Sequence, residues 1–148
     1  MAGSAFAGRG VRHLPEPGEA LTVAGMAEPL ALLAAAVVTL WGIAHAIPTR
    51  QVVAGFGPIG ADNRRVILQE WLAEAITMWG LAAVITAATL AGAGTDAAVW
   101  TYRAVAALLV ALAVLTAVTG ARTPVVWFKV CPVVLTCSAV LLLAASVA

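Results

Sequence analysis

The sequence predicts an all-α protein, an integral membrane four-helix bundle. Hydrophobic residues make up 63% of the 148 residues and charged residues only 10%, and the mean hydropathy is +1.02. Soluble domains are about half apolar and about a quarter charged, so this composition indicates a membrane protein. Four apolar runs follow one another, each long enough for a transmembrane helix, which needs about 20 residues. Together they leave no room for a soluble catalytic domain.

The predicted spans are 30–47, 66–90, 97–119 and 124–147. The first lies between Pro29 and Pro48, and proline suits the first turn of a helix but ends a helix that precedes it. The second follows Asp62 and Asn63, either of which can cap a helix N-terminus. A loop rich in glycine and proline separates these two spans. We expect it to lie against the end of the bundle, either as a connector or as a lid.

The third and fourth spans have equally clear boundaries. Thr95 and Asp96 are candidate caps before the third span, and Gly120 is a typical residue for its end. Thr123 is the candidate cap of the fourth span, and Pro124 suits its first turn. Because only a tight turn separates these two spans, we expect them to be antiparallel neighbours.

Residues 1–28 form a separate region, which we predict to be a flexible tail. The tail contains Arg9 and Arg12 but no continuous apolar run of the kind a signal peptide has. Met26 stands directly before the first span. The sequence therefore leaves two possible translation starts, Met1 and Met26.

The distribution of basic residues predicts the orientation of the spans. Cytoplasmic loops of membrane proteins carry an excess of Lys and Arg. The first and third loops with their flanks carry five basic residues: Arg50, Arg64, Arg65, Arg122 and Lys129. We therefore expect both termini to lie outside the cytoplasm. The bias toward Ala, Val and Arg is typical of a GC-rich bacterial genome, so we expect a multi-pass protein of the bacterial inner membrane.

Four ionisable residues are expected at similar depth in the cytoplasmic half: His45, Glu70, Glu74 and Lys129. Such residues are costly in a bilayer and therefore indicate a functional site. Glu70 and Glu74 lie on one helix face, about 40° apart in projection. We expect Glu74 to pair with Lys129 and His45 to bond Glu70, which would satisfy all four groups. Alternatively, the cluster carries a proton or cation, or binds a quinone or another small apolar ligand.

Metal binding and cysteine chemistry are less favoured by the sequence. One histidine and two glutamates can form a facial triad, but the ExxH pairs of carboxylate metal bundles are missing. We predict no metal site, and the cofactor is left unknown. Cys131 and Cys137 cannot bridge each other on a regular helix, and we interpret both as small packing residues. Pro132 is expected to kink the last span beside Lys129.

Aromatic and basic residues near the span ends are interpreted as interfacial anchors. Aromatic rings favour the boundary between lipid and water, and a long arginine side chain can reach it from inside the bilayer. The candidate anchors are Trp41, Trp100, Tyr102 and Arg103.

The chain resembles the DoxX-like family of small four-span bacterial membrane proteins over residues 30–148. The resemblance rests on the four-span topology and on the pattern Gly42-x-x-His45-x-x-Pro48 at the end of the first span. The family's namesake is associated with a quinone-linked sulfur-oxidising complex. The resemblance therefore implies an accessory or redox-linked membrane subunit of unassigned activity, and it identifies no catalytic residue.

Two other functions stay open. A proton-coupled small-molecule transporter would use Glu74, although small multidrug transporters carry their key glutamate in the first span rather than the second. A non-catalytic assembly or stabilising subunit is the other alternative. The expected partners are the lipid bilayer and either a membrane complex or a second copy of the chain. A net charge of +1 and the lack of a basic run argue against nucleic acid.

Overall fold

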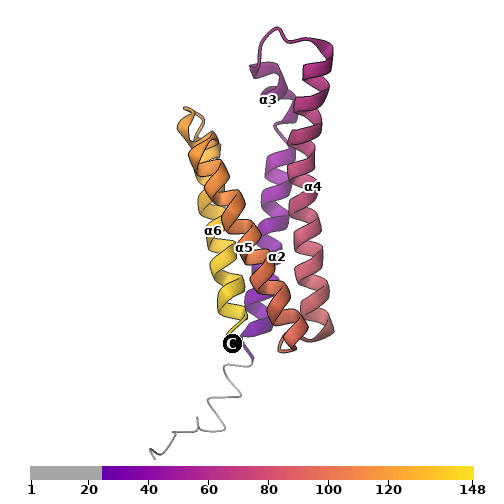
Figure 1. The fold of residues 1–148 in the computed structure, drawn as a ribbon, viewed down its shortest axis with the longest axis vertical. Helices are drawn as coiled ribbons and strands as arrows, with labels where there is room; N and C mark the ends of the chain where they lie inside the picture. Colours follow the sequence, from indigo (N-terminus) through magenta and orange to yellow (C-terminus); the bar gives the residue numbers. More distant parts are fainter. Residues whose placement is uncertain (1–24) are drawn as a thin grey trace, which may run out of the picture.

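Four long helices run up and down beside one another in the computed structural model, which describes residues 25–148 (Figure 1). In chain order the helices are α2 (Ala27–Ala46), α3 (Thr49–Gly55), α4 (Ala61–Gly92), α5 (Asp96–Val118), the 3₁₀ turn η1 (Gly120–Arg122) and α6 (Val126–Ala145). α2, α4, α5 and α6 are each long and apolar enough to cross a membrane. The predicted all-α fold and the multi-pass character are thereby confirmed.

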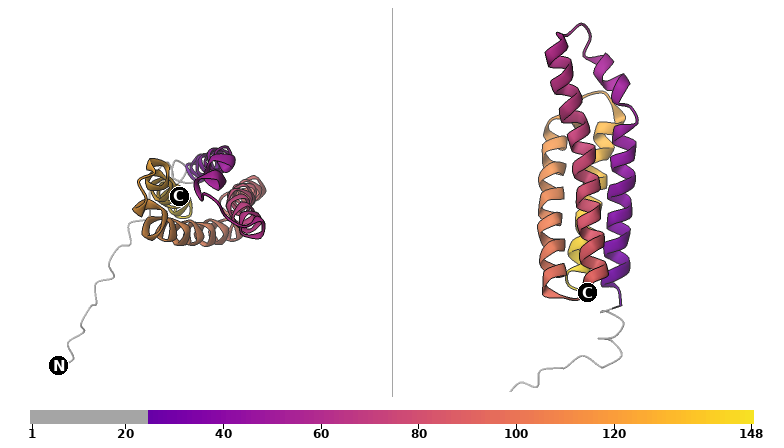
Figure 2. Two further views of the ribbon diagram at one scale, coloured as in Figure 1. Left: turned by 90° about the horizontal axis from the view of Figure 1, so that it is seen from above. Right: turned by 90° about the vertical axis from the view of Figure 1, so that its right-hand side faces the viewer.

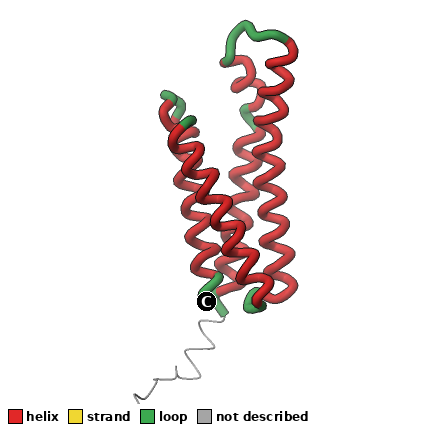
Figure 3. Tube along the Cα trace, in the orientation of Figure 1, coloured by secondary structure: helices red, strands yellow, loops and turns green. Residues whose placement is uncertain are grey.

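Loops are confined to the two ends of the bundle (Figure 3). One end, which we call the terminal end, is where α2 begins and α6 finishes, with the turn between α4 and α5 beside them. The other end, which we call the α3 end, holds α3 and η1 (Figure 1). The predicted antiparallel arrangement of the third and fourth spans is confirmed, because α5 and α6 pack along each other.

The helix boundaries differ from the predicted spans by a few residues. α2 starts at Ala27, so Glu28 and Pro29 lie in its first turn, where backbone N–H groups need no partner within the helix. The tail prediction is therefore wrong for residues 27 and 28, and residues 1–24 of the predicted tail lie outside the described residues. Thr95 caps α5 by accepting a hydrogen bond from the Ala98 amide. Thr123 does not cap α6, because its hydroxyl donates to the Gly120 carbonyl and α6 begins later.

α4 is the one helix that differs strongly from its prediction. It begins at Ala61, five residues before the predicted start at residue 66, and its 32 residues give a length of about 48 Å. The hydrocarbon core of a bilayer is only about 30 Å thick. The first turns of α4 are almost entirely exposed and rise with α3 above the tip of the α5–α6 hairpin (Figure 2). The predicted loop between the first two spans is therefore partly helical.

The interior is built mainly from small and aliphatic side chains. α2 contributes Ala31, Ala34, Ala35 and Val38, which are buried. Small residues let neighbouring helices approach closely, which supplies the packing contacts that hold membrane helices together. Among the glycines of residues 25–148, Gly42 leaves the least space, since a β-carbon there would lie 2.7 Å from Nε1 of Trp79. α2 is thus held tightly against α4.

Candidate functional site

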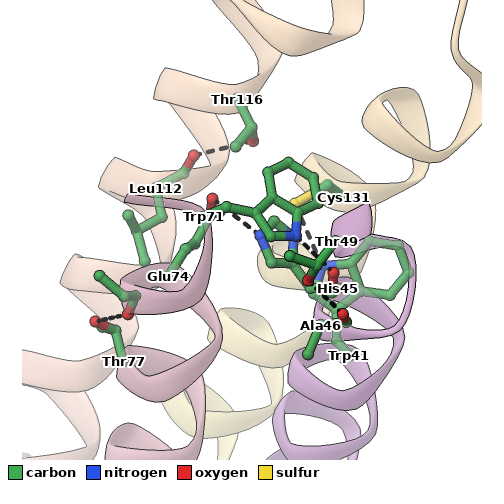
Figure 4. A network of polar contacts seen from close by, with 11 residues as sticks. Trp41, His45, Ala46, Thr49, Trp71, Glu74, Thr77, Leu112, Thr116 and Cys131 are labelled. Atoms are coloured by element: carbon green, nitrogen blue, oxygen red, sulfur yellow. Dashed lines mark hydrogen bonds and ion pairs between the residues drawn. The ribbon is translucent and has the colours of Figure 1, made fainter. Parts of the chain in front are cut away.

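Five side chains from three helices gather near the α3 end (Figure 4). α2 supplies Trp41 and His45, α4 supplies Trp71 and Glu74, and α6 supplies Cys131. All five are buried or half-buried. In a bundle whose interior is otherwise almost entirely apolar, this cluster is the candidate functional site.

The centre of the site is a histidine facing a carboxylate. Nε2 of His45 lies 3.5 Å from Oε2 of Glu74, and the two side chains are 8% and 29% exposed. Nε2 is fully buried and has no hydrogen-bond partner among the described residues. A buried polar atom without a partner costs free energy unless a proton, water or ligand satisfies it. The imidazole therefore retains unused hydrogen-bonding capacity at a point that faces a carboxylate.

Trp71 fixes the position of the histidine. Its ring stacks on the His45 ring, with centroids 3.9 Å apart and planes inclined by 18°. The same indole donates a hydrogen bond of 3.0 Å from Nε1 to the His45 backbone carbonyl. That carbonyl lies in the last turn of α2, where carbonyl groups have no partner within the helix. Trp71 thus holds both the side chain and the backbone of His45.

α6 closes the site from the third side. Nε1 of Trp41 donates to Sγ of Cys131 over 3.3 Å, and Cys131 is buried. The edge of Phe128 meets the Trp71 ring at a centroid distance of 6.0 Å. These contacts connect α6 to both α2 and α4 at the level of His45.

The predicted pairs are not formed. Glu74 faces His45, so the predicted pairs of Glu74 with Lys129 and of His45 with Glu70 are both wrong. Glu70 is exposed, although the neighbouring Trp71 packs against His45 inside the bundle. Lys129 is also exposed, and it lies about 200° around α6 from the buried Cys131. Within residues 25–148 neither group belongs to an ion pair.

Two of the four predicted anchors have other roles. Tyr102 is 0% exposed, and its hydroxyl lies 2.8 Å from Oγ1 of Thr89. Trp41 is directed at Cys131 inside the bundle. The anchor interpretation is wrong for both, because a partner on another helix satisfies the polar end of each ring.

Trp100 and Arg103 fit the predicted anchor role, which remains a prediction. Trp100 is 67% exposed, and the Arg103 guanidinium lies 5.4 Å from the centre of its ring. Trp127 is similarly exposed at the opposite end of the α5–α6 hairpin. The distance along α5 from Trp100 to its end at Val118 is about 27 Å, which is close to the thickness of the hydrocarbon core of a bilayer. With Trp100 and Trp127 taken as the two boundaries of the membrane, we expect the site at the α3-side boundary and the first turns of α4 outside it.

Trp71 and Cys131 were not predicted as site residues. Trp71 could have been found, because it is three residues before Glu74 and therefore shares its helix face. Nothing in the spacing of Cys131 indicates which helix it faces. No three metal-binding side chains lie close enough in the described part of the chain to hold an ion.

Comparison of the chain with protein-family models, with curated proteins and with solved structures finds no match. The chemistry of the site is thus argued from its geometry. A neutral imidazole beside a carboxylate can accept a proton, share it, and release it again.

Proposed function

We propose that this chain is a proton-exchanging membrane subunit, and that His45 and Glu74 hold the exchangeable proton. The observation that supports this proposal is the buried Nε2 of His45, which has no hydrogen-bond partner and faces the Glu74 carboxylate at 3.5 Å. A pair kept only for stability would be expected to form a complete hydrogen bond. A pair that gains and loses a proton must be able to exist with and without one.

The biological setting that we propose is an accessory or redox-linked subunit in the bacterial inner membrane, similar to the DoxX-like family. A quinone takes up protons when it is reduced, and its carbonyl oxygens accept hydrogen bonds. Nε2 of His45 is a donor of the required kind when it is protonated. Electrons would come from a partner in the membrane. The terminal end would face away from the cytoplasm, as the basic residues at the α3 end indicate.

Labelling with a hydrophobic carbodiimide tests the proton site directly. Dicyclohexylcarbodiimide reaches carboxyl groups through the lipid and reacts with the protonated form, and the mass of the adduct locates the modified residue. We expect modification at Glu74 that increases as the pH falls. Glu28, an exposed carboxylate at the terminal end, is the control and should react with a water-soluble carbodiimide instead. Absence of a Glu74 adduct at every pH would contradict the proposal.

A proton-coupled transporter is the second candidate, and one observation favours it. The Glu74 side chain is 29% exposed although it lies in a membrane-spanning helix. A transported molecule could therefore reach the carboxylate. Purification in mild detergent separates the two candidates. A bound quinone or a larger complex supports the accessory subunit, whereas a homodimer that releases protons when a cationic drug is added supports the transporter.

A further inference from the structure

We infer that the His45–Glu74 pair exchanges its proton through the α3 end alone, and that Glu70 is the surface carboxylate that delivers it. This inference rests on the proposed function, because it assigns a route to the same proton. It follows from two independent features of the bundle, which are the packing on the terminal side of the site and the position of Glu70 on α4.

The interior between the site and the terminal end is closed. Each of the four long helices contributes at least one side chain that is fully buried in this region: Val38, Met78, Ile85, Leu109 and Leu135. These side chains are apolar and cannot carry a proton. Ser138 is buried among them, but its hydroxyl donates to the Val134 carbonyl of its own helix.

The other polar side chains on that side also have hydrogen-bond partners. Thr39 and Thr86 donate to carbonyl groups of their own helices, and Thr89 and Tyr102 bond each other. The Thr89 hydroxyl donates to the Ile85 carbonyl, so its only hydrogen is used. The Tyr102 hydroxyl must therefore donate to Oγ1 of Thr89, at 2.8 Å. Both residues are buried. A proton arriving from the terminal end would meet these satisfied groups, and Thr89 and Glu74 are separated by about four turns of α4.

On the α3 side a second carboxylate lies one helical turn from Glu74. Glu70 is exposed and lies one helical turn before Glu74 on the same face of α4, a spacing that brings side chains within reach of each other. Its carboxylate belongs to no ion pair in the described residues, in contrast to Asp62, which binds Arg65 at 2.7 Å. Glu70 is therefore free to take a proton from water and pass it to Glu74.

The other groups around Glu74 do not offer a second path. α2 contributes His45, which is the partner itself, and α6 contributes the buried Cys131 and, on its exposed face, Lys129. α5 carries no titratable residue between Arg103 and its end at Val118.

The inferred route consists of three transfers of one proton. The proton moves from water to the Glu70 carboxylate, from Glu70 to the Glu74 carboxylate, and from Glu74 to Nε2 of His45.

The direction of access can be measured in proteoliposomes. The fluorescence of Trp71 reports the charge of His45, because the two rings are stacked. Comparison with the variant Trp71→Phe gives the part of the total tryptophan fluorescence that comes from Trp71. A cysteine placed at the exposed Gln51, labelled with a membrane-impermeant maleimide, gives the fraction of molecules whose α3 end faces outward. The external pH is then lowered suddenly.

We expect the immediate part of the Trp71 response to equal the labelled fraction, with the remainder appearing only after an ionophore equalises the internal pH. An immediate response of all molecules would show access from both ends. A response equal to the unlabelled fraction would show access from the terminal end. Either result would overturn the inference.

The role of Glu70 is tested by the rate of the immediate response. In Glu70→Gln the response should slow by about tenfold, which corresponds to an added barrier of about 1.4 kcal/mol, while its final amplitude stays the same. Glu70→Asp should restore the rate, and Asp62→Asn should leave it unchanged. A wild-type rate in Glu70→Gln, with the response absent in Glu74→Gln, would refute the relay alone. A response that persists in Glu74→Gln would refute the proposed function as well.

Discussion

The two ends of the bundle use polar side chains in opposite ways. At the terminal end Thr89 and Tyr102 satisfy each other in the core, and Nε of the exposed Arg103 donates to Oγ of the buried Ser146 over 3.4 Å. At the α3 end Nε2 of His45 has no hydrogen-bond partner, and the nearest carboxylate oxygen is 3.5 Å away. The polar groups of the terminal end thus fix the helices in place, whereas Nε2 of His45 at the α3 end has unused hydrogen-bonding capacity.

This comparison predicts that substitutions at the terminal end mainly lower stability. Tyr102→Ala removes a fully buried ring together with its hydrogen bond, and should lower the free energy of unfolding by about 3 kcal/mol or more. Trp100→Ala removes an exposed ring and should cost less than about 0.5 kcal/mol. Reversible unfolding in mixed micelles measures both values. Equal losses in the two variants would show that the Tyr102 environment is not a packed core.

The α3 half of the bundle is nevertheless tightly packed where α2 meets α4. In Gly42→Ala the new methyl group would lie 2.7 Å from Nε1 of Trp79 and 3.2 Å from Cβ of Met78. We expect a loss of about 1 to 3 kcal/mol from this crowding. Gly80→Ala is the matched control, because nothing lies within 4 Å of its added carbon. Thermal unfolding should show Gly80→Ala to be neutral or stabilising, since alanine favours helix.

Removing one polar atom at each end gives a sharper test of the comparison. Tyr102→Phe deletes only the hydroxyl, and should cost about 0.6 to 1 kcal/mol, the usual value of a hydrogen bond between membrane helices. Glu74→Gln should cause no comparable loss, because the His45–Glu74 contact lacks the geometry of a hydrogen bond. If Glu74→Gln destabilises the protein more than Tyr102→Phe, the pair is structural and the contrast between the ends disappears.

The smallest expected effect lies at the contact between Arg103 and Ser146, beside the end of α6. Ser146→Ala removes the acceptor for Nε of Arg103, but the guanidinium keeps its position near the Trp100 ring. The cost should be on the order of a few tenths of a kcal/mol, because the bond is long at 3.4 Å and the Arg103 side chain is exposed to solvent. A shift in thermal unfolding larger than that of Tyr102→Phe would make the Arg103–Ser146 contact, rather than the Thr89–Tyr102 contact, the main polar contact of this end.

The fold could be predicted from the sequence because each span is marked by its own local signal. The apolar runs, the flanking prolines and Thr95 with its capping hydroxyl are all visible without knowledge of a neighbouring helix. The early start of α4 and the short helix α3 were missed, because the glycine and proline residues between the spans suggest an irregular loop.

The partners in the site could not be predicted, because they depend on how each helix is rotated. Lys129 and Cys131 are only two residues apart, yet one is exposed and the other is buried. The sequence shows that Lys129, Glu74 and His45 lie at similar depth, but depth alone cannot decide which of them face each other. Tyr102 was misplaced for the same reason, since its acceptor Thr89 lies on another helix.

Infrared difference spectroscopy in nanodiscs tests the central claim most directly, because it detects the protonated carboxyl group itself. We expect a carboxyl C=O stretching band that changes with pH, disappears in Glu74→Gln, shifts in His45→Gln and persists in Glu28→Gln. If the pH-dependent carboxyl band of Glu74→Gln is identical to that of the wild type, Glu74 does not exchange a proton, and the account of the α3 end as a proton site is wrong.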